Sequence, residues 1–282
     1  MRRGWASRTA IWVSAWRGIA EFDDPAITRD PIAKRLVPLG WRLALEAAAR
    51  RPRVTRAALA LAAVATGGLS RHLPYRTRAI DDAIHEEHDR GTRQLVLLGA
   101  GLDARAHRLD VLSDVTVFEV DHPDTQAHKR DAVRDLAPRA KDVRYVSVDF
   151  SRDDLSSELS RAGHDPSAPT IFVWEGVTMY LPRPALDATL EKVRDLSAPG
   201  SCLLVTYYST QQPPLAALAH PVFAMVGEPL LTRFAPGEAR ALLAAHAFTL
   251  ETDEGDDEWG QRWFGKHPRW NMSERLARAR RT

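Results

Sequence analysis

Five short apolar segments between residues 94 and 208 constrain the fold of this chain most strongly. They are separated by helical or turn-forming segments and begin roughly 20 to 30 residues apart. Near-continuous apolar runs of this length are typical of strands that are buried on both faces of a parallel sheet. The sequence therefore predicts an α/β protein with a doubly wound, mostly parallel sheet. The expected strands cover residues 94–99, 115–121, 143–149, 169–175 and 201–208.

The segments on either side of these strands have different patterns. In the first 75 residues, apolar side chains recur at helical spacing without strand alternation, which predicts a helical cap over 1–75 and a second domain over 76–282. A proline-rich stretch at about 208–235 is predicted to be a lid inserted over the carboxyl edge of the sheet. Beyond it, we expect a helix over 236–246, a possible strand over 248–254 and a solvated, basic helical end over 269–282.

Composition excludes several classes of protein. The 282 residues are 44% hydrophobic and 27% charged with a net charge of +2, which gives no electrostatic basis for binding nucleic acid. The single cysteine, Cys202, allows neither an internal disulfide nor a cysteine metal cluster. The apolar run from Ala57 to Leu69 is too short to cross a bilayer, and no cleavable signal peptide is recognised. We therefore expect a cytoplasmic protein without a membrane partner, of unknown oligomeric state.

The motif GAGLDA, Gly99 to Ala104, follows the first expected strand and satisfies the dinucleotide-binding pattern G-x-G-x-x-G/A. Its glycines allow a ligand to approach the backbone closely. In a dinucleotide site the pyrophosphate lies at the following helix N-terminus, where Asp103 would repel it. A carboxylate there suits a cationic ligand such as S-adenosylmethionine better than NAD. Asp103 can also be explained as a helix N-cap, and the two roles are compatible.

Carboxylates end three of the expected strands, at Asp121, Asp149 and Glu175. Asp121 lies 20 residues after Gly101, where an acidic side chain can accept hydrogen bonds from both ribose hydroxyls of an adenosine ligand. Glu119 is the reserve candidate for this role, and a simple turn rich in Asp and Pro explains the segment equally well. Together the three carboxylates predict an acidic rim, which favours a cofactor with a cationic amino-acid end over a diphosphate.

Several longer motifs occur in a specific order and spacing. LVLLGAGLDARAHRL at 95 is followed by FEVDHPDTQAHKR at 118 and PTIFVWEGVTMYLP at 169, with YRTRAIDDAI at 75 before them. Over nearly its whole length the chain resembles the leucine carboxyl methyltransferase-like family of class I S-adenosylmethionine-dependent O-methyltransferases. Its C-terminal segment is similar to the bacterial small-molecule branch of that family.

The resemblance implies S-adenosylmethionine as the cofactor and a role for each of several residues. Arg76 would bind the methionine carboxylate, with Arg78 as the alternative, and Glu175 would meet the methionine amino group. The remaining contacts would be backbone or side-chain contacts of Gly99, Ala100, Gly101 and Asp103 along the turn, Asp121 at the ribose, and Asp149 with Phe150 at the adenine.

The expected reaction is methyl transfer by in-line displacement to a carboxylate or hydroxyl of a small, polyketide-like molecule. The acceptor pocket is expected to include the aromatic residues Trp12, Tyr180, Tyr207 and Phe223. No catalytic acid or base can be assigned, and no metal is expected, because the pair His85 and His88 lacks the HExxH spacing. The alternatives are a methyltransferase for a protein's C-terminal carboxylate, an NAD-dependent oxidoreductase, and a binding protein without turnover.

Overall fold

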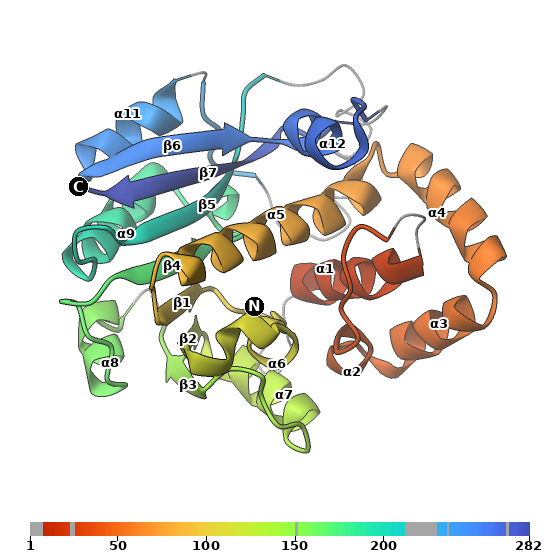
Figure 1. Ribbon diagram of the computed structural model, residues 1–282, viewed down its shortest axis with the longest axis horizontal. Coiled ribbons are helices and arrows are strands. Elements are labelled where there is room, and N and C mark those ends of the chain that lie inside the picture. The colour runs from red at the N-terminus through yellow and green to blue at the C-terminus, as the bar shows by residue number, and fades with distance from the viewer. Residues whose placement is uncertain (1–7, 23–25, 150–151, 212–229, 236, 269–270) are drawn as a thin grey trace.

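A seven-stranded mixed sheet forms the centre of the computed structural model, which describes residues 8–22, 26–149, 152–211, 230–235, 237–268 and 271–282 (Figure 1). The strand order is β3-β2-β1-β4-β5-β7-β6, and β1 to β5 are parallel to one another. The predicted doubly wound, mostly parallel sheet is confirmed. The strands are β1 Gln94–Leu98, β2 Thr116–Asp121, β3 Asp142–Ser147, β4 Thr170–Trp174, β5 Cys202–Tyr208, β6 Phe248–Glu254 and β7 Glu274–Arg281.

The last strand corrects one prediction. The basic segment at the chain end is not a solvated helix: β7 lies between β5 and β6 and is antiparallel to both. Its small apolar residues Ala277 and Ala279 are buried in the core. Arg278 and Arg280, which alternate with them, form ion pairs with Glu87. The alternation of apolar and basic residues is a strand pattern with a period of two.

Helices cover both faces of the sheet. On one face α5 and α12 pack over β1, β4 and β7, and on the other α8, α9 and α11 pack over β2 to β5. Both cores are continuous apolar clusters. The helices are α1 Arg8–Ile19, α2 Ala33–Leu36, α3 Leu39–Arg50, α4 Pro52–Ala65, α5 Leu69–Asp89, α6 Arg105–Arg108, α7 Pro123–Val133, α8 Leu155–Arg161, α9 Arg183–Asp195, α11 Glu238–Ala245 and α12 Asp256–Phe264, with 3-10 turns at Ala20–Phe22, Asp110–Asp114 and Thr178–Tyr180.

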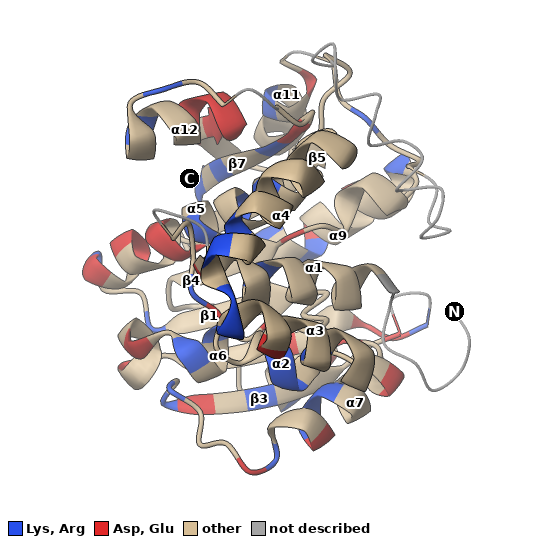
Figure 2. Cartoon of the chain, turned by 90° about the vertical axis from the view of Figure 1, so that its right-hand side faces the viewer, with Lys and Arg blue, Asp and Glu red and all other residues tan. Residues whose placement is uncertain are grey.

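The N-terminal helices gather at one end of the molecule. Among them, α1 contacts α2, α3 and α5, and α4 packs on α3 and α5 (Figures 1 and 2). Helix α5 runs without interruption across residue 75, so no break accompanies the boundary expected between 1–75 and 76–282. The division into a cap and a second domain therefore stays a prediction.

Most of the expected lid, residues 212–229, lies outside the described residues. On its two sides, Ser209 and Phe234 form an isolated parallel bridge, and α11 begins at Glu238, within the helix expected over 236–246. In the described part of the chain, no helix combines the length and the apolar character needed to cross a bilayer.

Candidate functional site

A cavity of about 650 Å³ lies where β1, β2 and β4 end, between the sheet and helix α1. Parallel strands bring their carboxyl ends to one edge, and this is where ligands bind in open α/β sheets. Predicted site residues that line it are Arg76, Gly99, Ala100, Gly101, Asp103, Asp121, Asp149, Glu175 and Tyr180. Its volume is within the range of about 300–1,000 Å³ that is usual for small-molecule sites.

The glycine turn forms the base of this cavity. Gly99 has φ of +70° and Gly101 has φ of +52°, a left-handed conformation that other residues rarely adopt. A Cβ atom on Gly99 would also lie 2.8 Å from Cγ2 of Val177. Both glycines are therefore required by the local backbone, and Gly99 is required by close packing as well.

Asp121 ends β2 beside this turn. Its carboxylate accepts a short hydrogen bond from the Gly101 N–H and a second, of 2.6 Å, from the His122 N–H. Burial raises the pKa of the Asp121 carboxyl, and these two hydrogen bonds offset only part of that effect. Among the described residues, none forms an ion pair with Asp121. Its oxygens keep lone pairs that can accept hydrogen bonds from hydroxyl groups of a ligand.

Asp103 of the glycine turn and Glu175 of the predicted acidic rim share one buried cationic partner, so Glu175 is not an open carboxylate of that rim. The guanidinium of Arg105 lies 2.5 Å from Asp103 Oδ2 and 2.7 Å from Glu175 Oε2. Burial opposes ionisation of Asp103, but Arg105 holds the pKa of its carboxyl well below the usual range. Asp103 also accepts a 2.7 Å hydrogen bond from the Arg105 N–H, but the N-cap of α6 is Ala104, so Asp103 is not the helix N-cap that the sequence suggests. Of the three rim carboxylates, Asp121 forms no ion pair with any described residue, and Asp149 lies 3.9 Å from the exposed Arg152.

Arg76 contacts the cavity but is held from two sides. Its Nε lies 3.0 Å from Glu175, and its Nη1 lies 2.7 Å from Glu274, a residue of β7. Gly176 packs against the guanidinium, where a Cβ would be 3.6 Å from Nη2. Arg78, the alternative, lies away from the cavity, with its guanidinium over the Trp263 ring.

The pairs continue into a buried series of alternating charges that we call the ion chain. Neighbours along it are joined by contacts of 2.7 to 3.0 Å except for its first pair, Asp30 and Arg108, at 3.9 Å. The members, in spatial order, are Asp30, Arg108, Asp81, Arg105, Glu175, Arg76, Glu274, His72 and Asp256. Sequence reasoning missed most of them. Arg105 could have been noticed two residues after Asp103, but Glu274 was hidden in a segment interpreted as a helix.

At the end of the ion chain near α12, burial and the neighbouring charges have opposite effects on the pKa values of the side chains. Burial disfavours the charged form of His72, but Asp256 and Glu274 raise its pKa to about 9. Burial also opposes ionisation of Glu274, but Arg76 and His72 lower its pKa to about 2. At neutral pH both side chains are therefore charged.

The two residues predicted to lie at the adenine are Asp149 and Phe150, and only one of them can be placed. Asp149 lines the cavity, 3.9 Å from the exposed Arg152. Phe150 lies outside the described residues. The reserve candidate Glu119 is fully buried with Lys129 at 2.5 Å, so it is not available to a ribose.

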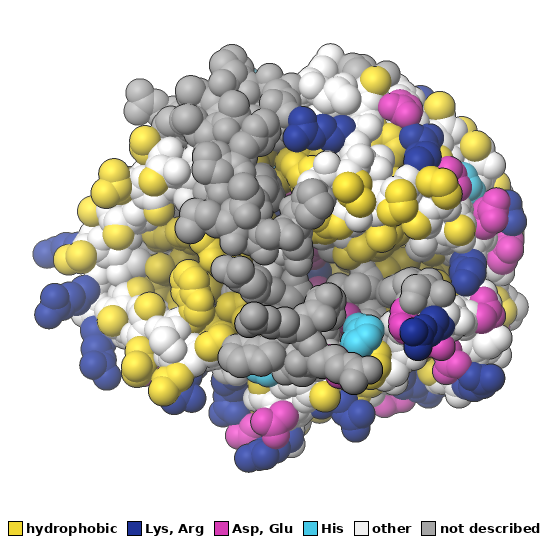
Figure 3. All heavy atoms as spheres, turned by 180° about the vertical axis from the view of Figure 1, so that it is seen from behind, with side chains coloured by type: hydrophobic (Ala, Val, Ile, Leu, Met, Phe, Trp, Pro, Cys, Tyr) yellow, Lys and Arg dark blue, Asp and Glu magenta, His cyan; other side chains and the backbone are white. Residues whose placement is uncertain are grey.

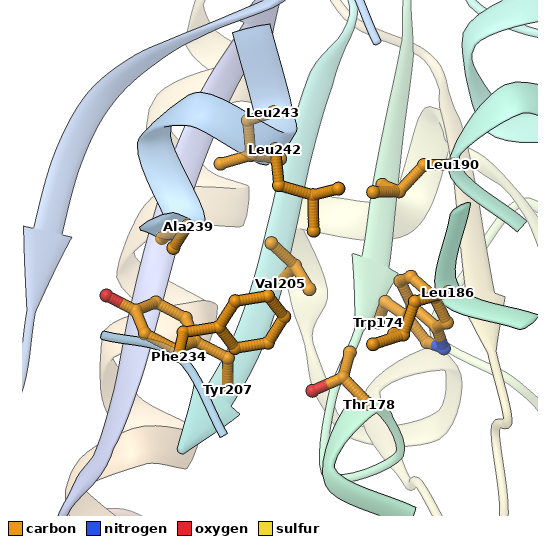
Figure 4. A pocket seen from close by; sticks show the side chains of 11 residues that line it. Trp174, Thr178, Leu186, Leu190, Val205, Tyr207, Phe234, Ala239, Leu242 and Leu243 are labelled. Atoms are coloured by element: carbon orange, nitrogen blue, oxygen red, sulfur yellow. The ribbon is translucent and has the colours of Figure 1, made fainter. Parts of the chain in front are cut away.

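The predicted acceptor residues are divided between the two faces of the sheet. Trp12 and Tyr180 line a smaller cavity of about 50 Å³ next to the main one, together with Tyr208 and Arg76. Tyr207 points to the opposite face, where its hydroxyl donates a 2.6 Å hydrogen bond to Asp253 and its ring contacts Phe234 (Figure 4). Tyr207 therefore does not line this cavity, whereas its neighbour Tyr208 does. Phe223 lies outside the described residues.

The part of the chain that the structure describes contains no group of three His, Cys, Asp or Glu side chains placed to hold a metal ion. His85 and His88 have different partners, the Asp81 carbonyl and Asp114. That the protein uses no metal stays a prediction.

A family model described as leucine carboxyl methyltransferase matches residues 10–194 of the chain. The chain belongs to the leucine carboxyl methyltransferase family. Two relatives are each named "Putative S-adenosyl-L-methionine-dependent methyltransferase". One, from Streptomyces coelicolor, is 39% identical over 204 residues, covering 71% of this chain and 65% of the relative. The other, from Mycobacteroides abscessus, is 32% identical over 270 residues, covering 88% of this chain and 85% of the relative.

Solved structures agree with the fold that this family membership implies. A protein from Thermobifida fusca, described as a putative methyltransferase, has a TM-score of 0.61 at 17% identity and covers 96% of this chain and 94% of its own. A DUF574 family protein from Streptomyces avermitilis has a TM-score of 0.62 at 14% identity, with 98% of both chains covered. The fold of this family member is the class I methyltransferase fold.

Proposed function

We propose that this protein is an S-adenosylmethionine-dependent O-methyltransferase whose acceptor is a small, polyketide-like molecule. The observation that carries the proposal is Asp121, which has no ion pair in the described structure and ends β2 beside a left-handed glycine turn at the base of a large cavity. Ribose hydroxyls are suitable donors to this carboxylate. The family membership and the names of the relatives support the same cofactor.

The residues present fit such a cofactor. Asp121 would hold the ribose hydroxyls, Arg76 the methionine carboxylate and Glu175 the amino group, while Asp149 would lie at the adenine. When bound, S-adenosylmethionine supplies a methyl group on a sulfonium, an electrophilic carbon with a good leaving group. The opposite charges of Arg76 and Glu175, 3.0 Å apart, match the two charges of an amino-acid end.

The main work of the protein in this reaction is positioning. In-line displacement requires the acceptor oxygen to be aligned with the methyl carbon, and holding both partners in one cavity removes much of the entropic cost. Apolar side chains on the acceptor side, such as Trp12, Val13 and Met179, exclude water from the reacting atoms.

The acceptor side of the cavity favours a carboxylate over a hydroxyl. A hydroxyl acceptor requires a general base within hydrogen-bond reach, whereas a carboxylate is already ionised. Among the described residues that line the smaller cavity, the one carboxylate is Glu274, which is held by Arg76 and His72, and there is no histidine. We therefore favour methyl ester formation.

The test is incubation with methyl-labelled S-adenosylmethionine and a panel of carboxylic and phenolic acceptors, followed by mild base. Base-labile label is expected, because esters hydrolyse under these conditions and ethers do not. A peptide ending in leucine belongs in the panel, and its methylation alone would move the assignment to a protein carboxylate. Tight binding of NAD without binding of S-adenosylhomocysteine would overturn the proposal in favour of an oxidoreductase.

The adjacent tyrosines of β5 provide a matched pair of variants for the acceptor pocket. Tyr208→Phe changes a residue of the smaller cavity, so we expect KM for the acceptor to rise severalfold. Tyr207→Phe makes the same chemical change on the opposite face, and the acceptor KM is expected to stay as in the wild type. An equal effect of both variants would mean that this cavity is not the acceptor pocket.

A further inference from the structure

The outer faces of α3 and α4 are unusually apolar. Seven large hydrophobic side chains are exposed among the described residues, and six of them lie on these two helices. Leu61 is 70% exposed and Leu39 is 61% exposed, so they are not covered by neighbouring helices. We call this surface the hairpin face; its apolar residues are Leu39, Leu43, Val54, Leu61 and Val64, whereas Trp41, which is 37% exposed, packs edge-on against Trp12.

The same two helices carry a concentration of positive charge. Residues 39–65 contain five arginines and one acidic residue, Glu46, so that five positive charges and one negative charge leave +4, against +2 for the whole chain. The arginines, all exposed, are Arg42, Arg50, Arg51, Arg53 and Arg56. In Figure 3, apolar and basic side chains are interleaved at the edge of the molecule where α3 and α4 lie.

The inner side of the hairpin is fixed to the rest of the molecule. Leu45 of α3 is buried in a cluster with Ala15 and Val37, and Thr55 and Leu59 of α4 are buried as well. Thr55 also donates hydrogen bonds to the carbonyls of Ala48 and Arg51, which tie the two helices together. Because the inner side is packed, the hairpin face cannot turn inward to bury its own apolar residues.

The positive charge of the hairpin face distinguishes between the partners that could cover it. A second copy of the chain placed on this face would bring two sets of five arginines together, which is electrostatically unfavourable. An anionic lipid surface accepts both features, since apolar side chains enter the boundary between headgroups and acyl chains while arginines contact phosphates. With 12 and 14 residues, α3 and α4 are shorter than the roughly 20 residues needed to span a bilayer, so they would lie parallel to its surface.

We propose that the hairpin face is a docking surface for membranes that contain anionic lipids. Leu43 and Leu61 enter the interface, and the arginines provide attraction that depends on ionic strength. This differs from the expectation, drawn from the sequence, that the protein has no membrane partner.

The test uses the full chain and vesicles of phosphatidylglycerol and phosphatidylcholine in equal amounts, with pure phosphatidylcholine vesicles for comparison. Co-sedimentation is expected with the anionic vesicles at low salt, and it is expected to weaken as salt screens the arginines. Arg50→Glu/Arg53→Glu should lower binding at least tenfold, and Leu43→Glu/Leu61→Glu should lower it to a similar extent. Arg134→Glu/Arg152→Glu is the control with the same change of charge, at side chains that are 76% and 83% exposed on other helices and loops; its binding should equal that of the wild type.

Several outcomes would overturn the proposal. They are the absence of vesicle binding at low salt, equal loss of binding in the control variant, and full retention of binding by the leucine variant. A dimer in light scattering that Leu43→Glu/Leu61→Glu dissociates would make the face an interface between copies of the chain. Binding of a short DNA duplex in place of vesicles would assign it to nucleic acid.

Discussion

Asp121 differs from Asp103 and Glu175, two other predicted carboxylates of the cavity, because no cationic side chain forms an ion pair with it in the described structure. Asp103 and Glu175 each contact Arg105, so their charges are balanced within the protein. Asp121 receives two backbone hydrogen bonds, and its pKa is raised by burial. A carboxylate in this state is costly to the folded protein when it is ionised, and donors from a ligand would reduce that cost.

We therefore predict that Asp121→Asn weakens binding of S-adenosylhomocysteine by at least about tenfold, because hydrogen bonds to a charged acceptor are worth about 1.5–3 kcal/mol each. Its thermal stability should change little, since the variant no longer ionises a buried carboxyl but its amide nitrogen cannot accept one of the two backbone hydrogen bonds. Titration calorimetry measures the first effect and thermal unfolding the second. Asp124→Asn, one turn away on α7 and outside the cavity, is the matched control. Unchanged affinity in Asp121→Asn would remove Asp121 from the ribose role.

The pKa of Asp121 also has a consequence for binding at low pH. Its protonated form loses a charged acceptor, so cofactor affinity should fall as the pH is lowered. Because the pKa is raised, the fall should begin at a higher pH than the value of about 3.9 for an ordinary aspartate would give. Binding measured between pH 4 and pH 7 should show this slope in the wild type and not in Asp121→Asn.

At the scale of single residues, the sequence predicts where a residue lies in the fold better than it predicts the direction in which the side chain points. Asp121, Gly99 and Gly101 were found because a strand that ends in a glycine turn fixes where they lie. Tyr207 and Tyr208 could not be distinguished, since every residue of β5 is buried and the apolar run has no alternation that marks its faces. The partners of Asp103 and Glu175 depend on where Arg105 points, which no local pattern specifies.

At the scale of elements, the glycine turn connects the fold to the site. Gly99→Ala would place a side chain in the left-handed region and against Val177, so we expect a loss of stability of about 1–3 kcal/mol. Binding of S-adenosylhomocysteine should weaken as well, because the turn forms the base of the cavity. Gly40→Ala is the matched control: it lies in α3 with no atom within 4 Å of the added Cβ, and should stabilise the protein by about 0.5–1 kcal/mol. Chemical denaturation compares the two, and equal effects would contradict this explanation.

Strand β7 and helix α5 are joined through Glu87. This buried carboxylate accepts hydrogen bonds from Arg278, Arg280 and Arg90. Glu87→Gln should lower the free energy of unfolding by about 2–4 kcal/mol, because buried guanidinium groups lose their counter-charge. Glu86→Gln removes a carboxylate that is 60% exposed and pairs with Arg278, so its effect should stay below about 1 kcal/mol. Similar losses in the two variants would show that burial of Glu87 is not the cause.

The sequence predicts the parallel strands but not β7, because the residues of β7 do not themselves indicate burial. Strands β1, β4 and β5 are mostly apolar and β2 has an apolar core, so their own composition indicates burial. Strand β7 contains four arginines, which suggest exposure when the segment is considered alone. Arg278 and Arg280 are accommodated in the structure by Glu87, about 190 residues earlier in the chain, and that pairing exists only after folding.

At the scale of the whole molecule, the ion chain connects the N-terminal helices to α12 across the cavity. The protonated form of His72 is stabilised by the two carboxylates that flank it, Asp256 and Glu274, with Arg76 and Tyr208 next to Glu274. A pKa of about 9 in the folded state, above the ordinary value of 6.5, gives stability that is complete below pH 6.5 and is lost as the pH rises through 9.

The free energy of unfolding should therefore fall by about 1–3 kcal/mol between pH 6.5 and 9. In His72→Gln, which has no titrating group at this position, the fall should be much smaller. His267→Gln, at a side chain that is 73% exposed, should keep the wild-type profile. Urea denaturation across this pH range makes the comparison, and a parallel fall in all three proteins would contradict the assignment to His72.

The position of β7 in the sheet also determines the order in which the protein can be completed during synthesis. Strand β6 precedes β7 in the chain, but β7 lies between β5 and β6. While the chain is still emerging from the ribosome, β5 therefore has an open edge and β6 has no neighbour to pair with. Glu274, which holds Arg76, arrives with the last strand as well. The parallel part of the sheet can form earlier, but the ion chain beside the cavity closes only when the final residues of this sequence are available.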